Sequence, residues 1–392
     1  MRVTFVSNYI NHHQIPVSEV LYEKWGEGYH FIQTEPMEEE RIKLGWNNEI
    51  KGIPYLLCYY DDPQGCQQLI EESDIVIFGG TDNEEYIKRR LESGKIVIRY
   101  SERLYKNGQW KAISPRGLYQ KYKDHTQYRN SPVYMLCAGG YVAHDFHIVH
   151  AYKGKRFRWG YFPEFEESTK EERLQWKAEG RIRILWAGRF IDWKHPESAL
   201  EVAKVLKEKG HDFTLTFAGG GEMEDELKRY VEEHGLKEYV HFEGFCAPEQ
   251  VRSLMRRSHI YLFTSDYKEG WGAVLNEAMN SGCAVVANHG IGAVPFLLKH
   301  NENGLIYQNG NIKELTELTE RLCQNREERI RFGDAAYETI ATEWNSKNAG
   351  EALIELCENV AVGKIEFREH GPLSEAPMIK QNKMYQYLTK KA

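Results

Sequence analysis

The sequence predicts an α/β protein made of two domains, each a doubly wound parallel sheet with helices on both of its faces. Its 392 residues exceed what one hydrophobic core usually supports, so two domains are expected. In the second half of the chain, short apolar runs alternate regularly with helical segments, as in a parallel sheet whose strands are joined by helices. The first half also contains apolar, strand-like runs, although their rhythm is less regular.

Four apolar runs predict strands of the first domain, at residues 2–7, 75–78, 96–99 and 134–137. The segment from Glu164 to Arg173 is polar and has no strand pattern, so we place an interdomain linker there. The expected division is a first domain over 1–165, a linker over 166–180, a second domain over 181–364 and a C-terminal tail over 365–392. The basic tail, which contains Met and Tyr, is expected either to pack back on the body, with the first domain as one candidate, or to stay mobile.

The elements of the second domain follow in a regular order. Strands are expected at residues 182–187, 213–218, 240–243, 260–265 and 283–287. Helices are expected to begin at Pro196 and Pro248, because proline is typical of the first turn of a helix. An acidic helix should end near Gly235, another helix should lie near 293–300, and Gly282 is expected to cap the helix that follows the strand at 260–265.

Composition excludes several classes of protein. The net charge of −7 argues against a nucleic-acid partner, which usually requires a basic surface. The seven cysteines show no metal-binding spacing, which favours free thiols in a reducing compartment. The first residues lack the apolar core of a signal peptide, and no segment has the roughly 20 apolar residues of a membrane-spanning helix. We therefore expect a cytoplasmic location, with the inner face of the membrane as a further option.

Two carboxylates flank a glycine-rich turn after the predicted strand at 260–265. Glu269 is followed by Gly270, Trp271 and Gly272, and Glu277 comes eight positions after Glu269, within the predicted helix. A wholly helical segment would separate these carboxylates by about 12 Å along its axis. That span suits a ligand with polar groups at both ends and phosphates between them, lying at the positive end of a helix. A nucleotide-sugar fits this description.

Two cations follow the predicted strand at 182–187. Arg189 comes directly after Gly188, and Lys194 follows five residues later, at the carboxyl end of a strand, where ligands bind in doubly wound sheets. Arginine and lysine together can clamp a diphosphate. A solvated basic loop would explain this pair alone equally well. The predicted sheet edge is the same for these cations and for the two glutamates, which favours the ligand-binding interpretation.

Taken together, these motifs resemble glycosyltransferase family 4. The resemblance includes the turn at 219–221, the segment from Phe242 to Phe245, and the segments at 303–307 and 343–345, and it covers residues 180–360. It implies the GT-B fold, in which two Rossmann-like domains face each other across a cleft. The C-terminal domain of that fold holds most of the nucleotide-diphosphate-sugar donor, and the expected reaction transfers the sugar to a saccharide or lipid-linked acceptor with retention of anomeric configuration.

The resemblance also implies roles for individual residues. Arg189 and Lys194 would neutralise the donor diphosphate, and Glu269 would accept hydrogen bonds from the donor sugar. Glu277 would bind the ribose hydroxyls. The remaining donor-binding candidates are Gly188, Gly244, Phe245, Gly270, Trp271 and Gly272. The absence of an Asp-x-Asp motif from the sequence agrees with catalysis that requires neither a metal nor another cofactor.

The first half departs from the family pattern, and acceptor-side candidates come from these departures. His12 and His13 stand where relatives often have a glycine pair, and either an acceptor contact or a structural role fits them. Glu102 stands where relatives often have a histidine. It would either assist deprotonation of the acceptor or pair with Arg103, and the pairing is slightly favoured. In the second half, the segment 288–292 replaces adjacent glycines, which leaves the ligand contacts there open.

Other interpretations remain open at this point. The basic and aromatic segment 153–159 would fit either a contact with anionic lipid or a solvated edge. The same architecture would also suit a nucleotide-sugar epimerase or a non-catalytic nucleotide-sugar sensor. A nicotinamide-dependent oxidoreductase is disfavoured, because no G-x-G-x-x-G follows the first strand.

Overall fold

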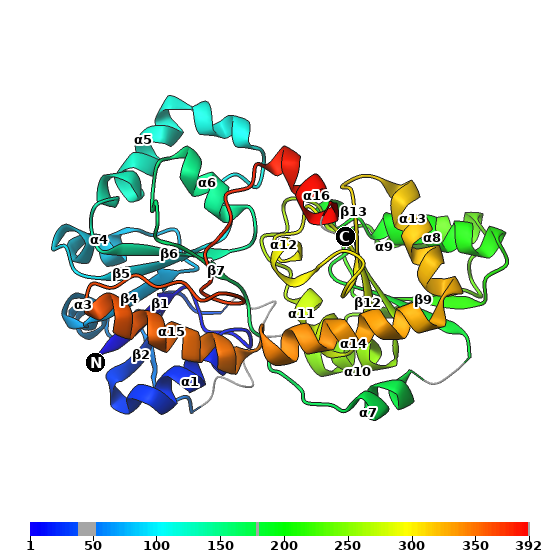
Figure 1. Ribbon diagram of the computed structural model, residues 1–392, viewed down its shortest axis with the longest axis horizontal. Coiled ribbons are helices and arrows are strands. Elements are labelled where there is room, and N and C mark those ends of the chain that lie inside the picture. The colour runs from blue at the N-terminus through cyan, green and yellow to red at the C-terminus, as the bar shows by residue number, and fades with distance from the viewer. Residues whose placement is uncertain (38–51, 178–179, 391–392) are drawn as a thin grey trace. The chain divides into compact units, whose positions relative to one another are not determined.

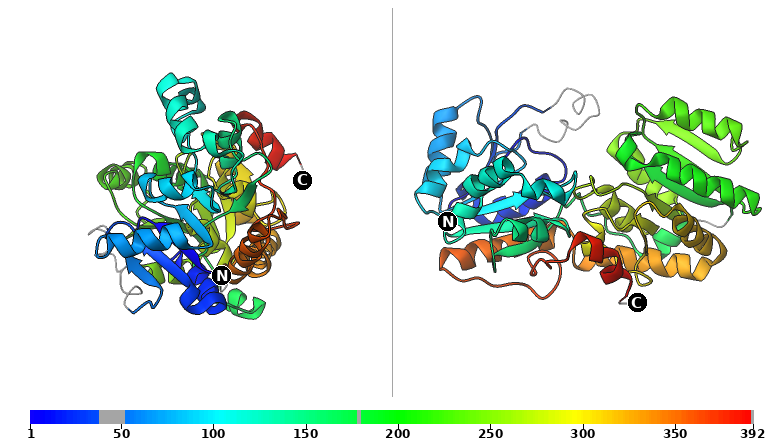
Figure 2. Two further views of the ribbon diagram at one scale, coloured as in Figure 1. Left: turned by 90° about the vertical axis from the view of Figure 1, so that its left-hand side faces the viewer. Right: turned by 90° about the horizontal axis from the view of Figure 1, so that it is seen from above.

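In the computed structural model, the chain forms two compact units (Figure 1). The structure describes residues 1–37, 52–177 and 180–390. Unit 1 contains Met1–Glu164 and Glu343–Lys380, and unit 2 contains Phe165–Thr342 and the segment that begins at Gln381. Each unit is built on its own parallel sheet, with helices packed on both faces (Figure 2).

The described residues of unit 1 form a seven-stranded sheet in the order β3-β2-β1-β4-β5-β6-β7, and every pair of neighbouring strands is parallel. The strands are β1 (Val3–Ser7), β2 (Tyr29–Gln33), β3 (Leu56–Cys58), β4 (Ile75–Gly79), β5 (Val97–Ser101), β6 (Val133–Ala138) and β7 (Arg156–Trp159). The helices are α1 (Ile15–Trp25), α3 (Pro63–Glu72), α4 (Glu85–Glu92), α5 (Pro115–Asp124), α6 (Val142–Ile148) and α15 (Ser346–Ala361). Every residue of β1, β4 and β6 is buried, as expected of strands covered on both faces.

The described residues of unit 2 form a six-stranded parallel sheet in the order β10-β9-β8-β11-β12-β13. The strands are β8 (Ile182–Ala187), β9 (Phe213–Ala218), β10 (Val240–Gly244), β11 (Ile260–Phe263), β12 (Ala284–Asn288) and β13 (Leu305–Tyr307). The helices are α7 (Lys170–Trp176), α8 (Pro196–Glu208), α9 (Glu224–Glu233), α10 (Pro248–Arg257), α11 (Val274–Asn280), α12 (Val294–Leu297), α13 (Ile312–Gln324), α14 (Arg326–Thr342) and α16 (Gln381–Thr389). The expected order of strands and helices in this half is confirmed, and Gly282 has a positive φ of 65° just after α11.

The prediction was incomplete in the first half. It found β1, β4, β5 and β6 but missed β2, β3 and β7. The segment 153–159, considered above as a lipid contact, forms β7 over most of its length. Arg156 and Phe157 are buried, and the Arg156 guanidinium donates to the carbonyl oxygens of Tyr152 and Ala143. This segment therefore does not form a basic surface.

The expected linker is instead a packed part of unit 2. Thr169 and Glu172 form a capping box at the start of α7. Arg173 lies over the Tyr337 ring, with its guanidinium carbon 3.8 Å from the ring centroid, and also pairs with Asp334 on α14. A charged segment looks like a linker in sequence, but here Glu172 and Arg173 have fixed partners.

The C-terminal boundary also differs from the expected one. Residues 343–364, assigned above to the second domain, group with unit 1, because α15 packs against α1. A Cβ atom on Gly350 would lie 2.6 Å from the Cβ of Val20, so glycine permits this close approach of the two helices. The tail is divided: residues 365–380 group with unit 1, and α16 groups with unit 2.

Candidate functional site

The predicted donor-binding residues follow the carboxyl ends of strands in the six-stranded sheet. Because its strands are all parallel, the loops after β8, β9, β10, β11 and β12 emerge at one edge. Those loops contain Gly188 and Arg189, the turn at 219–221, Phe245, and the segment from Thr264 to Gly272. The sheet topology thus gathers residues that are more than eighty positions apart in sequence.

An ion pair joins two of the predicted catalytic residues. The Lys194 ammonium lies 2.5 Å from a carboxylate oxygen of Glu269, and the Ser265 hydroxyl donates to the same oxygen over 3.0 Å. The side chains of Lys194 and Glu269 are only 14% and 13% exposed. Water therefore screens this pair weakly, and a partly buried lysine and carboxylate are held together at the sheet edge.

Further hydrogen bonds hold the loop after β8 against the loop after β11. The Thr264 hydroxyl donates to the Lys194 carbonyl over 2.7 Å and accepts from the Trp186 indole N–H over 2.8 Å. The Asp266 amide donates to the Trp193 carbonyl over 2.9 Å. These bonds fix the backbone on both sides of the ion pair, so Lys194 and Glu269 are positioned before any ligand binds.

The sequence analysis did not identify His195, which lies beside this pair. Its Nδ1 atom is 2.8 Å from a carboxylate oxygen of Glu197, and its Nε2 atom is 3.7 Å from a carboxylate oxygen of Asp266. The neighbouring carboxylates of Asp266 and Glu197 raise the pKa of His195 to about 9, so the imidazole is protonated at neutral pH. The pKa of the Asp266 carboxyl is shifted in the opposite direction. Burial alone would raise this pKa, but the contact with His195 contributes to lowering it below its usual value.

Arg189 is exposed in the same loop, where a ligand can reach its guanidinium. The backbone next to it is tightly packed. Gly219 has φ of +145°, and a Cβ atom there would lie 1.8 Å from the Gly188 carbonyl oxygen. The turn after β9 can therefore approach the loop that carries Arg189 only with glycine at position 219.

Phe245 covers the glycine turn from the neighbouring strand. Its ring is 65% exposed, and a Cβ atom on Gly220 would lie 2.8 Å from it. The Gly219 amide donates to the Gly244 carbonyl over 2.8 Å. An exposed aromatic face beside a tight backbone turn can stack on a planar ring of a ligand.

The glycine-rich turn precedes α11, whose N-cap is Ala273. Trp271 is fully buried, and its indole N–H donates to the Asn276 side chain over 2.9 Å. The segment 288–292, which differs from the family pattern, packs on this turn. The Gly292 amide donates to the Glu269 carbonyl, and a Cβ atom on Gly292 would lie 1.7 Å from the Gly270 carbonyl oxygen. Gly292, the second glycine of this segment, thus allows its backbone to lie close to that of Gly270, although the segment lacks the adjacent glycines of relatives.

Glu277 is buried in α11, with 9% of its surface exposed. Burial raises the pKa of Glu277 to about 7, and the positive charge of Arg252 counteracts this only in part. Glu277 and Glu269 both raise the pKa of the buried Tyr261 phenol further, beyond the effect of burial. Both glutamates of the spaced motif therefore lie close enough to Tyr261 to act on its phenol.

The acceptor-side candidates of unit 1 form a cluster of their own. The rings of His12 and His13 have centroids 3.8 Å apart, and His13 stacks on Tyr161 with centroids 5.8 Å apart. The Tyr161 hydroxyl donates to Glu102, which also pairs with Lys106. The cluster therefore joins both histidines to Glu102 through one half-buried tyrosine.

The expected pairing of Glu102 with Arg103 is wrong. Arg103 lies 3.3 Å from the carboxylate of Asp145, and both side chains are buried. Adjacent residues on an extended segment point to opposite sides, so neighbours in sequence are poor candidates for an ion pair. Within the described ranges, no group of three or more His, Cys, Asp or Glu residues could hold a metal ion.

Comparison with known proteins finds a family match in the second half of the chain. Residues 168–339 match the model of the glycosyl transferases group 1 family. This segment is similar to that family. The match covers the part of unit 2 that carries the Lys194–Glu269 pair, and the group 1 assignment agrees with the resemblance stated from the sequence motifs.

The curated relatives match about half of the chain. The amylovoran biosynthesis glycosyltransferase AmsK of Erwinia amylovora is 30% identical over 185 residues, which are 46% of this chain and 45% of that protein. The alpha-D-kanosaminyltransferase of Streptomyces kanamyceticus is 27% identical over 48% of each chain. The chain thus spans about half the length of the curated relatives it matches.

Solved structures resemble nearly the whole chain. Anabaena HepE in complex with UDP superposes with a TM-score of 0.68 at 15% identity, covering 91% of this chain and 100% of that one. A glycosyltransferase from Rickettsia africae superposes with a TM-score of 0.65 at 15% identity, covering 92% of this chain and 98% of that one. This likeness shows the fold: the chain has the GT-B fold with two Rossmann-like units.

Proposed function

We propose that this protein transfers a sugar from a nucleotide-diphosphate-sugar donor to a saccharide or lipid-linked acceptor, with retention of anomeric configuration. The observation that carries this proposal is the partly buried pair of Lys194 and Glu269 at the carboxyl edge of the six-stranded sheet, beside the exposed Arg189. A cation that can contact phosphate and a carboxylate that can accept hydrogen bonds from sugar hydroxyls are thereby held within hydrogen-bond distance of each other.

The proposed mechanism is electrostatic. When the bond between sugar and diphosphate breaks, negative charge accumulates on the departing nucleoside diphosphate. Arg189 and Lys194 would stabilise that charge, and cations positioned in this way contribute several kcal/mol to a comparable transition state. The protonated His195 adds a third positive charge at this edge. Glu269 would orient the sugar through its hydroxyl groups, with Ser265 keeping the carboxylate in place.

The nucleoside end of the donor has two candidate contacts. The exposed Phe245 ring supplies a face on which a base could stack, and Glu277 would accept hydrogen bonds from the ribose hydroxyls. Relatives differ in their donors: HepE was crystallised with UDP-glucose, and a mycobacterial relative is described as GDP-mannose-dependent. Uracil and guanine donors therefore both belong in the test.

The first experiment is a panel of UDP- and GDP-sugars, assayed for transfer and for donor hydrolysis, with NAD as a comparison in thermal-shift measurements. Donor-dependent release of UDP or GDP, with product of the same anomeric configuration as the donor by NMR, would support the proposal. Conversion of the donor sugar without nucleotide release would indicate an epimerase instead. Nucleotide binding without turnover on the panel would indicate a sensor.

The second experiment tests the site. Glu269→Gln should reduce transfer at least a hundredfold while melting remains close to wild type, because the amide cannot accept as the carboxylate does. Arg189→Gln combined with Lys194→Gln should weaken nucleoside-diphosphate binding far more than nucleoside binding. Arg181→Gln is the matched control, because Arg181 directly precedes the first residue of β8, at the other end of the strand from Arg189. Equal losses for diphosphate and nucleoside would argue against the clamp.

A further inference from the structure

A cavity of about 320 Å³ lies at the amino-terminal edge of the six-stranded sheet in unit 2. Gly180, His259 and Gly282, which precede β8, β11 and β12, line it. These three strands are parallel neighbours, so the loops before them meet at the edge opposite the loops that carry Lys194 and Glu269. The cavity is therefore separate from the proposed donor site.

Positive side chains line this cavity, which we call the basic cavity. Four cations come from α7, the residue after α7 and the start of α14: Arg173, Lys177, Arg326 and Arg329. Asp334 is the one carboxylate in the described lining, and it already pairs with Lys170 and Arg173 over 2.8 and 3.1 Å. The basic cavity therefore keeps an excess of positive charge.

Two guanidinium groups of the basic cavity hold a buried donor without an acceptor. The Nε atoms of Arg173 and Arg329 have no hydrogen-bond partner among the described residues. Other N–H groups of Arg173 donate to the Ser168 carbonyl and to Asp334. The Arg329 guanidinium donates to the Leu322 carbonyl. Because burying an N–H group without an acceptor is unfavourable, the two Nε donors favour an anion that reaches them.

The pKa values of neighbouring groups reflect the same excess of positive charge. Burial lowers the pKa of Lys177, and the charges of Arg183 and Arg173 lower it further. Burial and the charges of the surrounding cations lower the pKa of His259 to about 4, so its imidazole is neutral at pH 7. An anion in the basic cavity would offset the repulsion between these cations.

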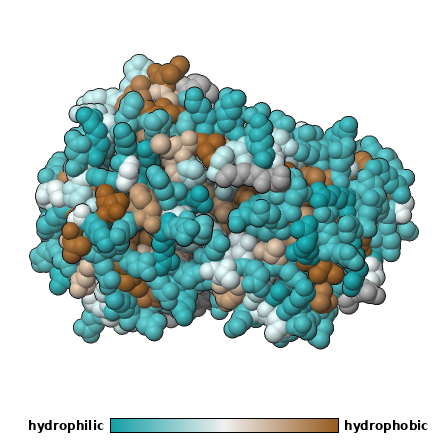
Figure 3. Space-filling model, viewed as in Figure 1, coloured by the Kyte–Doolittle hydropathy of each residue, from teal (hydrophilic) through white to brown (hydrophobic). Residues whose placement is uncertain are grey.

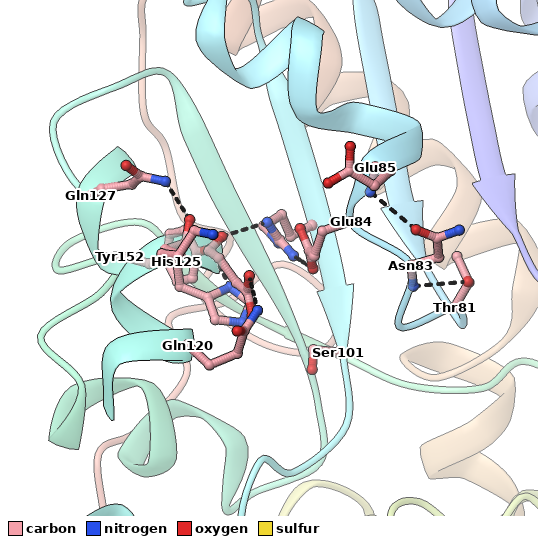
Figure 4. A network of polar contacts seen from close by, with 12 residues as sticks. Thr81, Asn83, Glu84, Glu85, Ser101, Gln120, His125, Gln127 and Tyr152 are labelled. Carbon is pink, nitrogen blue, oxygen red and sulfur yellow. Dashed lines mark hydrogen bonds and ion pairs between the residues drawn. The ribbon is translucent and has the colours of Figure 1, made fainter. Parts of the chain in front are cut away.

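Two buried arginines of unit 1 show a different arrangement. Arg99, on β5, pairs with Glu84, which Figure 4 shows beside that strand. Arg103 pairs with the buried Asp145 over 3.3 Å. Each of these arginines has a carboxylate of its own, whereas the cations of the basic cavity share Asp334.

The size and chemistry of the basic cavity fit a phosphate group on a small molecule. Its volume lies at the lower end of the range for small-molecule sites, about 300 to 1,000 Å³. Arginine and lysine are both typical ligands of phosphate. No helix in the described part of the chain has the length and apolar composition needed to cross a bilayer, and Figure 3 shows mainly hydrophilic surface on the visible side of unit 2, in the right-hand half of the view. A nucleic acid fits less well, because it requires a basic stripe and the chain has a net charge of −7.

We propose that the basic cavity binds the phosphate group of a small molecule, either a phosphate ester or free phosphate. The Nε–H groups of Arg173 and Arg329 donate to the phosphate oxygens. The Lys177 ammonium donates to two carbonyl groups of α10 and has a third hydrogen for the phosphate. The organic part of an ester lies beside Leu174, which is 38% exposed. Because the donor binds at the opposite edge, occupancy of this site does not depend on the proposed transfer activity.

Calorimetric titration of the full chain, without nucleotide, measures the binding. Inorganic phosphate and glucose 6-phosphate are titrated at constant ionic strength, with glucose as the comparison. We expect saturable binding of at least one phosphate ligand and none of glucose. Tighter binding of glucose 6-phosphate would identify the ligand as an ester, and tighter binding of inorganic phosphate would identify it as the free ion.

Substitutions at exposed lining positions test the location, because the buried cations also hold helix ends in place. Leu174→Glu adds a carboxylate and should weaken phosphate binding about tenfold or more, whereas Leu174→Gln, of the same shape, should change it less than about twofold. Arg326→Glu should weaken binding similarly. Lys237→Glu, at an exposed position elsewhere in unit 2, is the matched control and should leave binding unchanged.

Several results would overturn the proposal. They are no saturable binding of either phosphate ligand, equal losses in Leu174→Glu and Leu174→Gln, and wild-type binding by both Leu174→Glu and Arg326→Glu. Binding that survives these variants but is lost in Arg189→Gln with Lys194→Gln would place the phosphate at the opposite edge. Because no nucleotide-sugar is present, a negative result leaves the proposed transfer activity untouched.

Discussion

At the scale of single residues, the site depends on groups whose protonation differs from their usual state. His195 is flanked by two carboxylates and is cationic at neutral pH, whereas burial favours the neutral form of Glu277. Both pKa values are raised in the folded state, so each group makes stability fall as pH rises, over a different pH range. Each can be isolated by comparison with a variant that cannot titrate.

The first prediction concerns His195. Its pKa is raised from 6.5 to about 9 in the folded state, so its stabilising contribution is fully present below pH 6.5 and is lost as pH rises through 9. His195→Asn should therefore be less stable than wild type at pH 6.5, and the two should converge by pH 10. Asparagine is chosen because it tolerates the left-handed backbone of this residue, whose φ is 50°.

Urea denaturation at a series of pH values measures this difference. His150→Asn is the matched control, because His150 is also left-handed, with φ of 55°, and is exposed. A difference for His195→Asn that does not change with pH would indicate that the imidazole acts by packing and not by charge.

The second prediction concerns Glu277. Its folded-state pKa of about 7 exceeds the usual 4.5, so the native protein binds more protons than the unfolded chain in this window, and stability falls as pH rises through it. We compare the free energy of unfolding of Glu277→Gln with that of wild type, without nucleotide. The difference in favour of the variant should grow by about 3 kcal/mol between pH 4.5 and 8, since each pKa unit is about 1.4 kcal/mol. A difference in unfolding free energy that is the same at pH 4.5 and at pH 8 would contradict the raised pKa of Glu277. The same variant should bind nucleosides more weakly if Glu277 contacts ribose.

At the scale of elements, close backbone approaches hold together the loops that follow the strands of unit 2. The turn after β9 meets the loop after β8 at Gly219 and Gly188, and the turn before α11 meets the segment 288–292 at Gly270 and Gly292. These contacts are between backbones, so they explain why glycines recur along this edge.

The third prediction follows from Gly219. Gly219→Ala should lower the free energy of unfolding by more than about 2 kcal/mol, because its Cβ atom would overlap the Gly188 carbonyl oxygen and the left-handed conformation adds to the strain. Gly210→Ala is the control: its φ is also positive, at 75°, but no atom lies within 4 Å of the new Cβ, so about 1 kcal/mol is expected. Chemical denaturation measures both. A similar loss of unfolding free energy in the two variants would show that the close approach to the Gly188 carbonyl oxygen does not require glycine at position 219.

At the scale of the whole molecule, the chain crosses between its two units more than once. Unit 2 is formed mainly by the segment from Phe165 to Thr342, after which α15 returns to unit 1 and α16 returns to unit 2. The core of unit 1 therefore depends on residues near the C-terminus. A substitution that disrupts the packing of α15 should consequently destabilise unit 1, although the helix follows the main segment of unit 2 in sequence.

The fourth prediction tests this division. Gly350→Val should destabilise unit 1, because a Cβ atom at position 350 meets Val20 on α1 at 2.6 Å. Hydrogen exchange should increase in residues 1–164 and 343–380, whereas protection in unit 2 and its affinity for nucleoside diphosphate should stay unchanged. Glu351→Val, at the adjacent exposed position, is the control. Exchange that increases mainly in unit 2 would contradict the assignment of α15.

Much of the second unit could be predicted from the sequence, because its strands are short apolar runs and proline and glycine mark several of its helix ends. The Lys194–Glu269 site could be anticipated because parallel strands end at one edge. In the first half, β2 and β3 carry Tyr, His, Gln and Cys within or beside their apolar residues, and β7 alternates arginine with aromatic residues. Such mixed strands do not stand out from their surroundings, and only their neighbours in the sheet reveal them.

The sequence by itself determined the fold class, the resemblance of its second half to a family, and the charged residues that follow the strands of unit 2, since these follow from local patterns and fixed spacings. Tertiary structure alone decided which charges meet. It paired Arg103 with Asp145, not with Glu102, it placed α15 in the first unit, and it surrounded His195 with two carboxylates. The physical reason is that burial and electrostatic pairing depend on distances between segments far apart in the chain, which no local pattern encodes.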